Sequence, residues 1–412
     1  MQNIAIIGGG VTGITTAYAL LNRGFEVTVF ERNRYAAMET SFANGGQLSA
    51  SNSEVWNHWP TIAKGLKWMF RANAPLLINP KPSWHKLSWF AQFIAAIPRY
   101  AENTTATASL AIEARDYLFE WARKEAIDFD VGRQGILHVY RQKASFEHAA
   151  YVTELLKKGG LERHAVSPAE MREIEPNLAG DYYGGFYTQS DSTGDIHKFT
   201  HGLAAAVQRR GGHMRYACGI TDLGATNDGA WVASDQGRER FDAVVVCAGV
   251  SSRAIAAKLG DRVNVYPVKG YSITVALDDQ QSQQAAPVMS LLDDETKLVS
   301  SRLGEDRLRV AGTAEFNGFN RDIRDDRIQP LVDWVARCFP GVSTRKAIPW
   351  AGLRPTMPDM MPKVGEGRRP GVFYNTGHGH LGWTLSAITA EQVATAVAAA
   401  TSQGTFAQPV TR

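Results

Sequence analysis

The stretch Ile4-Ala-Ile-Ile-Gly-Gly-Gly-Val-Thr-Gly13, near the start of the chain, decides the fold class. Residues 4–7 are a short apolar run that stops at glycines, which is typical of a buried strand. Residues 11–22 carry apolar side chains at helical spacing and end just before Gly24, a common helix stop. Residues 25–30 form a second apolar run. Because two parallel strands must be joined by a crossover, the opening sequence predicts a β-α-β unit.

Gly8, Gly10 and Gly13 form the pattern G-x-G-x-x-G of a dinucleotide-binding turn. In such a turn the first glycine makes the tight bend, the second lets the backbone approach a pyrophosphate, and the third allows close helix packing. The start of the following helix favours phosphates through its free N–H groups. Glu31, at the end of the second strand, can accept hydrogen bonds from a ribose diol. The pattern predicts a dinucleotide site without separating NAD from FAD.

The chain of 412 residues has a globular composition, with 44% hydrophobic and 21% charged residues. At roughly 150 residues per domain, its length suggests two or three domains. A net charge of +3, without any lysine or arginine block, argues against a nucleic-acid partner. Cys218, Cys247 and Cys338 form no C-x-x-C pair, so we expect reduced thiols, no metal site and a cytoplasmic location. We expect neither a signal peptide nor a membrane-spanning segment.

Two further glycine-rich segments favour FAD over NAD. Residues 39–48, Glu-Thr-Ser-Phe-Ala-Asn-Gly-Gly-Gln-Leu, are small and polar where an NAD-binding domain usually begins another helix. Residues 373–384, Phe-Tyr-Asn-Thr-Gly-His-Gly-His-Leu-Gly-Trp-Thr, place a glycine turn before the last helix. Backbone N–H groups there can stabilise the negative charge that develops on a reduced flavin. A long flavin cofactor extends past the pyrophosphate and needs both segments.

The remaining sequence predicts a second domain that interrupts the first. Residues 241–247 are nearly all apolar and suit a central strand, whereas residues 263–276 and 307–314 alternate as antiparallel strands do. We therefore expect an α/β plus α+β fold. It would combine a Rossmann-type FAD-binding domain (residues 1–55, 186–262 and 345–412) with an inserted substrate-binding domain containing a mixed or antiparallel sheet (residues 56–185 and 263–344).

Tryptophans are concentrated in residues 56–89, with Trp56, Trp59, Trp68, Trp84 and Trp89 interleaved with lysines and an arginine. Aromatic rings suit the headgroup level of a bilayer, and cations suit anionic lipids. The same rings can instead pack the second domain. The segment therefore indicates either a peripheral membrane contact or a structural core.

Several specific motifs are spread from end to end: Thr40-Ser-Phe-Ala-Asn-Gly-Gly-Gln47, Gly65-Leu-Lys-Trp-Met69, Gly132-Arg-Gln-Gly135, Tyr266-Pro-Val-Lys-Gly-Tyr-Ser272, Gly352-Leu-Arg-Pro355 and Asn375-Thr-Gly-His-Gly-His-Leu-Gly-Trp-Thr384. With them the chain resembles the FAD-dependent D-amino acid dehydrogenase small subunits, a bacterial branch of the D-amino acid oxidase and glycine oxidase flavoproteins.

The resemblance implies a non-covalent FAD. Relatives that attach the flavin use a cysteine just after the Gly352-Leu-Arg-Pro355 motif, where this chain has Thr356-Met-Pro. The cofactor-binding residues that it implies are Gly8, Gly10, Val11, Thr12, Gly13, Glu31, Arg32, Ser41, Asn44, Gly45, Gly46, Gln47, Leu48, Ala248, Gly249, Gly377, His378, Gly379, Leu381, Gly382, Trp383 and Thr384.

Three residues are expected beside the substrate. Arg354 stands where glycine oxidase-like relatives carry the arginine that pairs with the substrate carboxylate, and a planar guanidinium suits that task. His380 stands where related dehydrogenases more often have threonine and some oxidases arginine. It could touch a ligand carboxylate or a ring hydroxyl, or pack against Trp383. Tyr271 lies on a strand that would face the substrate, although a core aromatic needs no function.

The expected reaction is oxidative deamination of a D-amino acid, with hydride transfer from Cα to flavin N5 and hydrolysis of the imino acid to a 2-oxo acid and ammonia. D-Alanine-like substrates are the family default, with D-proline or hydroxy-D-proline as alternatives. The family implies a quinone or another non-oxygen electron acceptor, and a peripheral location on the inner face of the bacterial cell membrane is the alternative to a free cytoplasmic one. Rival interpretations are an oxygen-using oxidase of this fold, an NAD-dependent dehydrogenase and a non-catalytic FAD-binding subunit.

Overall fold

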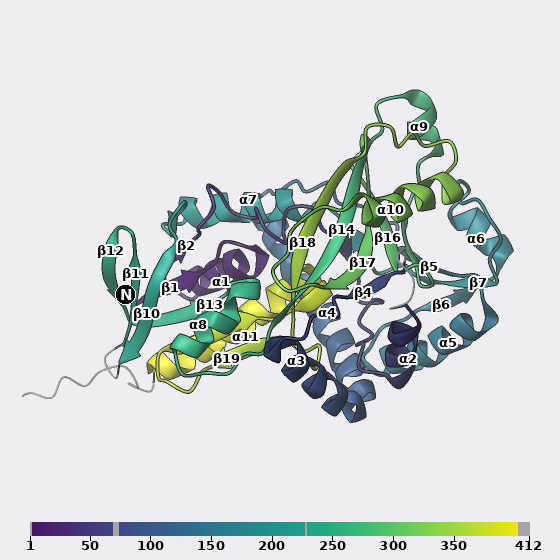
Figure 1. Ribbon diagram of the computed structural model, residues 1–412. Helices are drawn as coiled ribbons and strands as arrows, with labels where there is room; N and C mark the ends of the chain where they lie inside the picture. Colours follow the sequence, from purple (N-terminus) through teal and green to yellow (C-terminus); the bar gives the residue numbers. More distant parts are fainter. Residues whose placement is uncertain (1, 69–73, 227–228, 403–412) are drawn as a thin grey trace, which may run out of the picture.

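The isoleucine-rich run is strand β1 (Asn3–Ile7), which lies inside a six-stranded sheet of the computed structural model. The structure describes residues 2–68, 74–226 and 229–402 (Figure 1). Neighbouring strands in this sheet are parallel, except that β19 and β20 are antiparallel. Their order is β19 (Lys363–Glu366), β20 (Val372–Thr376), β13 (Ala243–Val246), β1, β2 (Glu26–Phe30) and β9 (His213–Arg215).

Both faces of this smaller sheet are covered, which explains why its strands are almost continuously apolar. Ile4 and Ile6 share a core with helices α1 (Val11–Asn22), α4 (Tyr100–Lys124), α7 (Ile196–Arg209) and α11 (Gly382–Ser402). Ala5 and Ile7 share a second core with helix α8 (Ser252–Lys258) and with the antiparallel strands β10 (Ile220–Thr226), β11 (Gly229–Ser234) and β12 (Gly237–Phe241).

The larger sheet is mixed and mostly antiparallel. It runs in the order β18 (Ile348–Thr356), β14 (Tyr266–Ala276), β17 (Arg307–Phe316), β16 (Leu298–Leu303), β15 (Ser290–Asp293), β5 (Ile136–Tyr140), β7 (Gly184–Thr188) and β6 (His164–Val166), while β4 (Leu76–Ile78) pairs with β17. In Figure 1 the long strands β14, β17 and β18 stand beside the smaller sheet.

Further helices surround the larger sheet. Helix α10 (Asp325–Cys338) packs its buried Leu331 and Trp334 into the same core as Ile273 and Val310 of the sheet. The others are α2 (Trp59–Trp68), α3 (Trp84–Ala95), α5 (Lys143–Lys158), α6 (Pro168–Ile174) and α9 (Gln280–Ala285). Three 3-10 turns, η1 (Ile97–Arg99), η2 (Gly249–Ser251) and η3 (Gly379–Leu381), and the two-stranded pair β3 (Gln47–Leu48) and β8 (Ser192–Thr193) complete the elements.

The chain passes repeatedly between the two sheets, so the expected combination of a Rossmann-type sheet with an inserted mixed sheet is confirmed. We propose that the sheets mark two domains, near the boundaries expected from the sequence. Since β7 and β18 pair within the larger sheet, two of those boundaries fit the strand pairing better after Thr188 and after Thr356. The described helices include none that is long and apolar enough to cross a membrane.

Candidate active site

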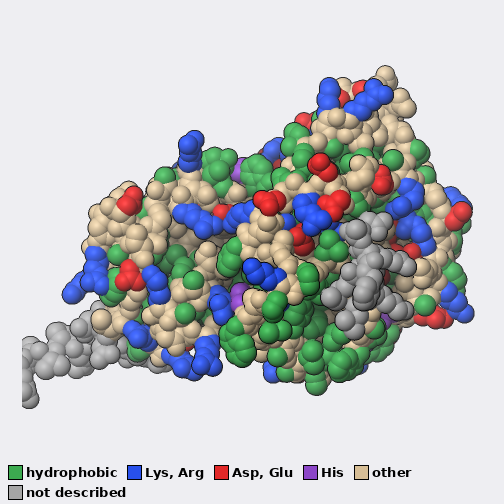
Figure 2. Space-filling view, viewed as in Figure 1, with side chains coloured by type: hydrophobic (Ala, Val, Ile, Leu, Met, Phe, Trp, Pro, Cys, Tyr) green, Lys and Arg blue, Asp and Glu red, His purple; other side chains and the backbone are tan. Residues whose placement is uncertain are grey.

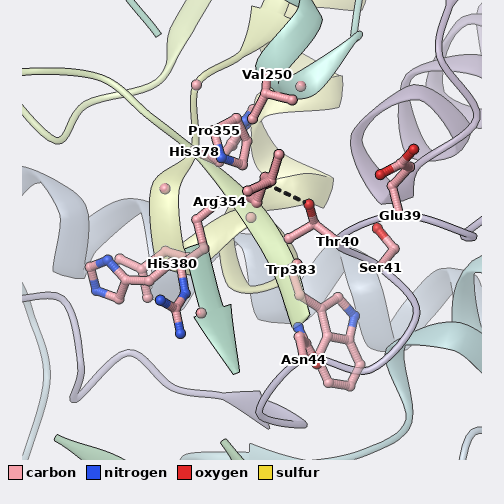
Figure 3. Close-up of a pocket in the computed structure, with 18 of the residues that line it drawn as sticks. Glu39, Thr40, Ser41, Asn44, Val250, Arg354, Pro355, His378, His380 and Trp383 are labelled. Atoms are coloured by element: carbon pink, nitrogen blue, oxygen red, sulfur yellow. Dashed lines mark hydrogen bonds between the residues drawn. The ribbon is translucent and has the colours of Figure 1, made fainter. Parts of the chain in front are cut away.

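A cavity of about 940 Å³ lies where the two sheets meet, and residues from both line it. Three of its walls are glycine-bearing turns that follow β1, β13 and β20. These strands are adjacent and parallel, so their carboxyl ends open at one edge of the sheet, where α/β folds bind ligands. Segments far apart in the sequence therefore converge on one site (Figure 3).

The first turn has the geometry expected of its glycines. Gly8 has φ +111°, and a Cβ there would lie 2.6 Å from the carbonyl oxygen of Cys247. A Cβ on Gly13 would lie 1.8 Å from the carbonyl oxygen of Gly8, so this glycine sets the helix close to the strand and does not line the cavity. Gly10, Val11 and Thr12 do line the cavity, at the start of α1.

Glu31 and Arg32 follow β2 and line the cavity next to this turn. The carboxylate of Glu31 is buried and accepts hydrogen bonds from the backbone N–H of Gly9 at 2.7 Å and from Asn33. A carboxylate offers about four lone-pair directions, so acceptor capacity remains for a ribose. Arg32 forms an ion pair with Glu39 at 2.6 Å.

The segment of residues 39–48 is attached to the larger sheet. Ser272, Ser301 and Arg309 donate hydrogen bonds to the carbonyl oxygens of residues 43, 45 and 44, at 2.8, 2.7 and 3.1 Å. Thr40 donates to the carbonyl oxygen of Leu353 at 2.9 Å, the contact drawn in Figure 3. This segment therefore joins the turn after β1 to the strands of the second sheet.

Of the residues expected in this segment, Ser41, Asn44, Gly45 and Gln47 line the cavity. Ser41 Oγ accepts a hydrogen bond from the N–H of Val11 at 3.0 Å. Gly46 and Leu48 are not among the lining residues. Leu48 is buried in the core under the smaller sheet, because its side chain points to the opposite side of a short strand from Gln47.

The turn after β20 contributes Gly377, His378, Gly379, Leu381, Gly382, Trp383 and Thr384 to the lining, and the turn after β13 contributes Ala248 and Gly249. Gly377 has φ +83°, and a Cβ there would lie 2.5 Å from Met357. His378 is buried, with Nε2 at 3.0 Å from Thr389 Oγ1 on α11. Removal from water lowers the pKa of His378 to about 3, so its ring is neutral at pH 7.

Two buried polar atoms of the lining residues fit a cofactor with both donors and acceptors. Trp383 Nε1 and Gln47 Oε1 have no hydrogen-bond partner among the residues that the structure describes. Buried polar groups are normally paired, so a bound molecule is expected to complete them. Together with the cradle at Gly8 and Gly10 and the volume of the cavity, these atoms fit FAD.

The sequence reasoning missed one wall of the cavity. Ile220, Thr221 and Leu223 at the start of β10, with Val250 and Ile255, form a largely apolar lining near the first turn. The segment Ile220-Thr-Asp-Leu223 carries no motif that could have distinguished it in the sequence. Its apolar character suits a flat aromatic base.

Arg354, on β18, has its guanidinium in the cavity wall. Its Nη1 donates to the carbonyl oxygen of Thr313 at 2.8 Å, and its Nη2 lies 3.5 Å from that of Gly312. No carboxylate of the described residues pairs with it, and removal from water lowers its pKa to about 10. The group is therefore a cation at neutral pH, with N–H donors left for an anionic ligand.

His380 lies near Arg354 (Figure 3) and stacks on Trp56, with ring centroids 5.1 Å apart and planes at 17°. Its Nε2 lies 3.2 Å from the carbonyl oxygen of Asn52, which only accepts, so Nε2 carries the proton. Removal from water, with a smaller effect of the charge on Arg354, lowers the pKa of His380 to about 4. A neutral ring does not attract a carboxylate. The stacking on Trp56 favours a packing role, and its Nδ1 acceptor is without a partner among the described residues.

Tyr271, on β14, lines the cavity, but its hydroxyl is engaged elsewhere. That hydroxyl donates to Glu315 Oε2 at 2.7 Å, and Lys269 Nζ lies 3.4 Å from the other oxygen of the same carboxylate. Tyr271 therefore belongs to a buried cluster behind the cavity wall. Gly270, Thr313 and Trp56, none of which was expected beside the substrate from the sequence, also line the cavity.

Comparisons with known proteins show what the whole chain is similar to. The family model described as "FAD dependent oxidoreductase" matches residues 3–396. "D-amino acid dehydrogenase 3" of Mesorhizobium japonicum is 60% identical, with 97% of each chain covered. "D-amino acid dehydrogenase" of Paramagnetospirillum magneticum is 42% identical, with 93% of this chain and 92% of that one covered. The crystal structure of glycine oxidase from Geobacillus kaustophilus, 22% identical, superposes with a TM-score of 0.72 over 97% of this chain and 95% of that one.

The neutral, buried His378 predicts a pH-dependent stability. Its pKa is lower in the folded chain, at about 3, than the value of about 6.5 in an unfolded chain, so stability is complete above pH 6.5 and falls as the pH drops towards 3. Between pH 7.5 and pH 5, protonation of this histidine in the unfolded chain should lower the free energy of unfolding by about 2 kcal/mol. Urea titrations should therefore show a smaller loss over this interval for His378→Asn than for the wild type. The exposed His213→Asn should keep the wild-type dependence, and equal losses in all three proteins would refute the assignment.

Proposed function

The chain belongs to the family of FAD-dependent oxidoreductases, and we propose that Arg354 binds the carboxylate of the D-amino acid that the enzyme oxidises. The activity is the FAD-dependent oxidative deamination of a D-amino acid to a 2-oxo acid and ammonia. The observation that carries the proposal for Arg354 is a protonated guanidinium in the cavity wall, held by carbonyl oxygens and without an acidic partner among the described residues.

FAD supplies the acceptor for the hydride of the substrate when it is bound. We propose that this chain holds FAD without a covalent bond. The turn at residues 8–13 and Glu31 would hold the ADP half, and the segment at residues 39–48 and the turn at residues 377–384 would hold the flavin half. The buried Trp383 N–H and Gln47 amide oxygen give these last two segments the donors and acceptors that they need.

The chain's own contribution to the reaction is to orient the substrate and to keep water away. A guanidinium binds a carboxylate through two parallel hydrogen bonds, which fixes the direction of the bond to the α-carbon. The stacked pair of His380 and Trp56 encloses the neighbouring side of the cavity. We assign no catalytic base, since a substrate that binds with a neutral amine needs none.

We further propose that electrons leave to a quinone or another non-oxygen acceptor and that the protein contacts the membrane surface through α3. Trp84, Leu87 and Ile94 are 79%, 54% and 46% exposed and follow each other on one side of this helix. Figure 2 shows hydrophobic atoms gathered where α3 lies in Figure 1. An exposed apolar stripe of this kind suits an interfacial helix.

The tryptophans of residues 56–89 were expected either to contact a membrane surface or to pack the core, and their exposure differs from one to the next. Trp89 is buried against Phe93 and Phe316, and Trp56 stacks on His380, so these two pack the interior. Trp59 and Trp84 are exposed. Of the other aromatic and basic residues of the segment, Arg71 and the side chains of Lys64, Lys67 and Trp68 lie outside the described residues.

The role of Arg354 is tested by Arg354→Met in the FAD-loaded protein. Removing one partner of a buried charge pair costs about 2–5 kcal/mol, so kcat/KM for the preferred D-amino acid should fall by roughly 30- to 5,000-fold. Bound FAD should be unchanged. The exposed Arg172→Met serves as the control and should keep wild-type kinetics. A kcat/KM within a few-fold of wild type for Arg354→Met would contradict the proposal.

The acceptor is tested by assaying a panel of amino acids, both enantiomers of each, with a soluble dye and separately in air. We expect turnover of D-enantiomers with the dye, and hydrogen peroxide far below the amount of 2-oxo acid formed in air. Peroxide equal to the 2-oxo acid would show an oxidase. Including D-alanine, D-proline and hydroxy-D-proline in the panel separates the open-chain from the cyclic substrate class.

The membrane contact is tested by sedimentation with vesicles that contain anionic lipid. The double variant Trp84→Asp, Leu87→Asp should lose most vesicle binding while its dye-linked activity stays at the wild-type level, because α3 lies outside the cavity lining. Tyr183→Asp, at another exposed aromatic side chain, should bind as the wild type does. Binding that is unchanged in the double variant would rule this surface out.

A further inference from the structure

We propose that Gly270 and the β-bulge at Thr313 position the guanidinium of Arg354, so that residue 270 controls how the enzyme grips the acid group of its substrate. This inference rests on the proposed role of Arg354 in binding the substrate carboxylate. It assigns a positioning role to a glycine in the middle of a buried strand, where glycine is otherwise unfavourable.

The side chain of Arg354 lies flat across strand β14. Arg354 is paired with Val268 of β14, and Gly270 follows two residues further along, on the same face of the sheet. A Cβ on Gly270 would lie 2.4 Å from Cζ, Nη1 and Nη2 of Arg354. Real Cβ atoms do not approach other atoms so closely, so the guanidinium occupies the space that a side chain at residue 270 would need.

Beyond β14, the guanidinium reaches carbonyl oxygens of β17 at a break in the strand ladder. Lys269 is paired with Glu315 and Tyr271 with Gly312, so Thr313 and Ala314 stand opposite the single residue Gly270. This is a β-bulge, in which backbone groups leave the regular ladder. The carbonyl oxygens of Gly312 and Thr313 accept from Arg354 at 3.5 and 2.8 Å.

This geometry requires an unusual backbone conformation at Thr313. Its φ is +55°, in the left-handed region that a β-branched residue rarely adopts. Such strain persists only where the surrounding structure fixes it, and it occurs often at functional sites. The strained residue is also the one whose carbonyl oxygen makes the shorter bond to Arg354, which ties the strain to the position of the cation.

A buried cluster fixes the bulge on both of its sides. Tyr271 donates its hydroxyl to Glu315, and Lys269 pairs with the same carboxylate, with Lys269 and Glu315 only 0% and 3% exposed. These residues flank the bulge on β14 and β17. Separating such buried charges is costly, so the register beside Gly270 resists change. This gives Tyr271 a positioning role.

The arrangement orients the cation without neutralising it. A carboxylate in place of the two carbonyl groups would also hold the guanidinium, but it would compete with the carboxylate of the substrate. Carbonyl oxygens bear only a partial charge, so the full positive charge stays available to a ligand. The absence of a side chain at Gly270 is what lets the Arg354 side chain reach those oxygens.

The test is Gly270→Ala in the FAD-loaded enzyme, assayed with the preferred D-amino acid and a soluble dye. Displacing the guanidinium by about 1 Å should lower kcat/KM on the order of 10²-fold, with KM rising and bound FAD unchanged. The control is Gly224→Ala in β10, where a Cβ would lie 2.7 Å from Trp231 and Gly224 is not a lining residue. It should keep wild-type kinetics.

A double-mutant cycle with Arg354→Lys separates positioning from general damage. A slender lysine leaves room for a Cβ at residue 270. In the Arg354→Lys background, Gly270→Ala should therefore lower kcat/KM less than about 3-fold, so the two effects should be far from additive. If Gly270→Ala alone does not yield soluble protein, the double variant should restore soluble protein that binds FAD. Failure of both variants to fold would overturn the inference, because the clash would then not be with Arg354.

The outcomes also separate this inference from the proposed function. If Arg354→Met leaves kcat/KM within a few-fold of the wild type, the carboxylate-binding role of Arg354 fails. If Arg354→Lys lowers kcat/KM but Gly270→Ala does not, or if the two losses multiply, only the positioning role of Gly270 fails. If Gly270→Ala lowers kcat/KM and adding Arg354→Lys does not lower it further, the carboxylate-binding role of Arg354 and the positioning role of Gly270 are both supported.

Discussion

The positive charge of Arg354, half-buried at the junction of two sheets and held by backbone carbonyl oxygens, is the constraint on which the site depends. A buried cation is costly, and it is stable only when polar groups surround it or an anion arrives. The neighbouring rings follow the same rule. His380 and His378 are neutral at pH 7 because both are removed from water, and His380 also lies near this charge. Arg354 is therefore a cation in the cavity wall with no acidic side-chain partner among the described residues, so its charge stays available to an acid group.

The second requirement is that the two sheets stay in register with each other. Three turns at the carboxyl ends of β1, β13 and β20 form one side of the cavity, and β14, β17 and β18 form the other. The segment at residues 39–48 connects them through hydrogen bonds from Ser272, Ser301 and Arg309. These hydrogen bonds, together with the one from Thr40 to the carbonyl oxygen of Leu353, join the segment proposed to bind the flavin to the sheet that carries Arg354. They therefore limit changes in the distance between the two.

Much of this could be predicted from the sequence because it depends on local patterns. Gly8 and Gly13 indicate a tight turn, because a side chain at either residue would collide with the backbone. The apolar periodicity of the flanking residues predicted β1, α1 and β2. Arg354 was found through a family motif. What the sequence could not give are features produced by strand pairing across long distances. The bulge opposite Gly270, the engagement of the Tyr271 hydroxyl by Glu315 and the stacking of His380 on Trp56 each join residues from different parts of the chain. Leu48 was expected at the cofactor, and only the pleat of β3 reveals that it faces the core.

The most direct test of the central claim is a crystal structure of the FAD complex with 2-aminoisobutyrate, an amino acid that cannot be oxidised because it has no hydrogen on its α-carbon. The account predicts FAD between the three glycine-bearing turns and the carboxylate of the ligand on the guanidinium of Arg354, which keeps its bonds to the carbonyl oxygens of Gly312 and Thr313. A ligand carboxylate bound elsewhere, with the Arg354 side chain turned out of the cavity, would contradict it.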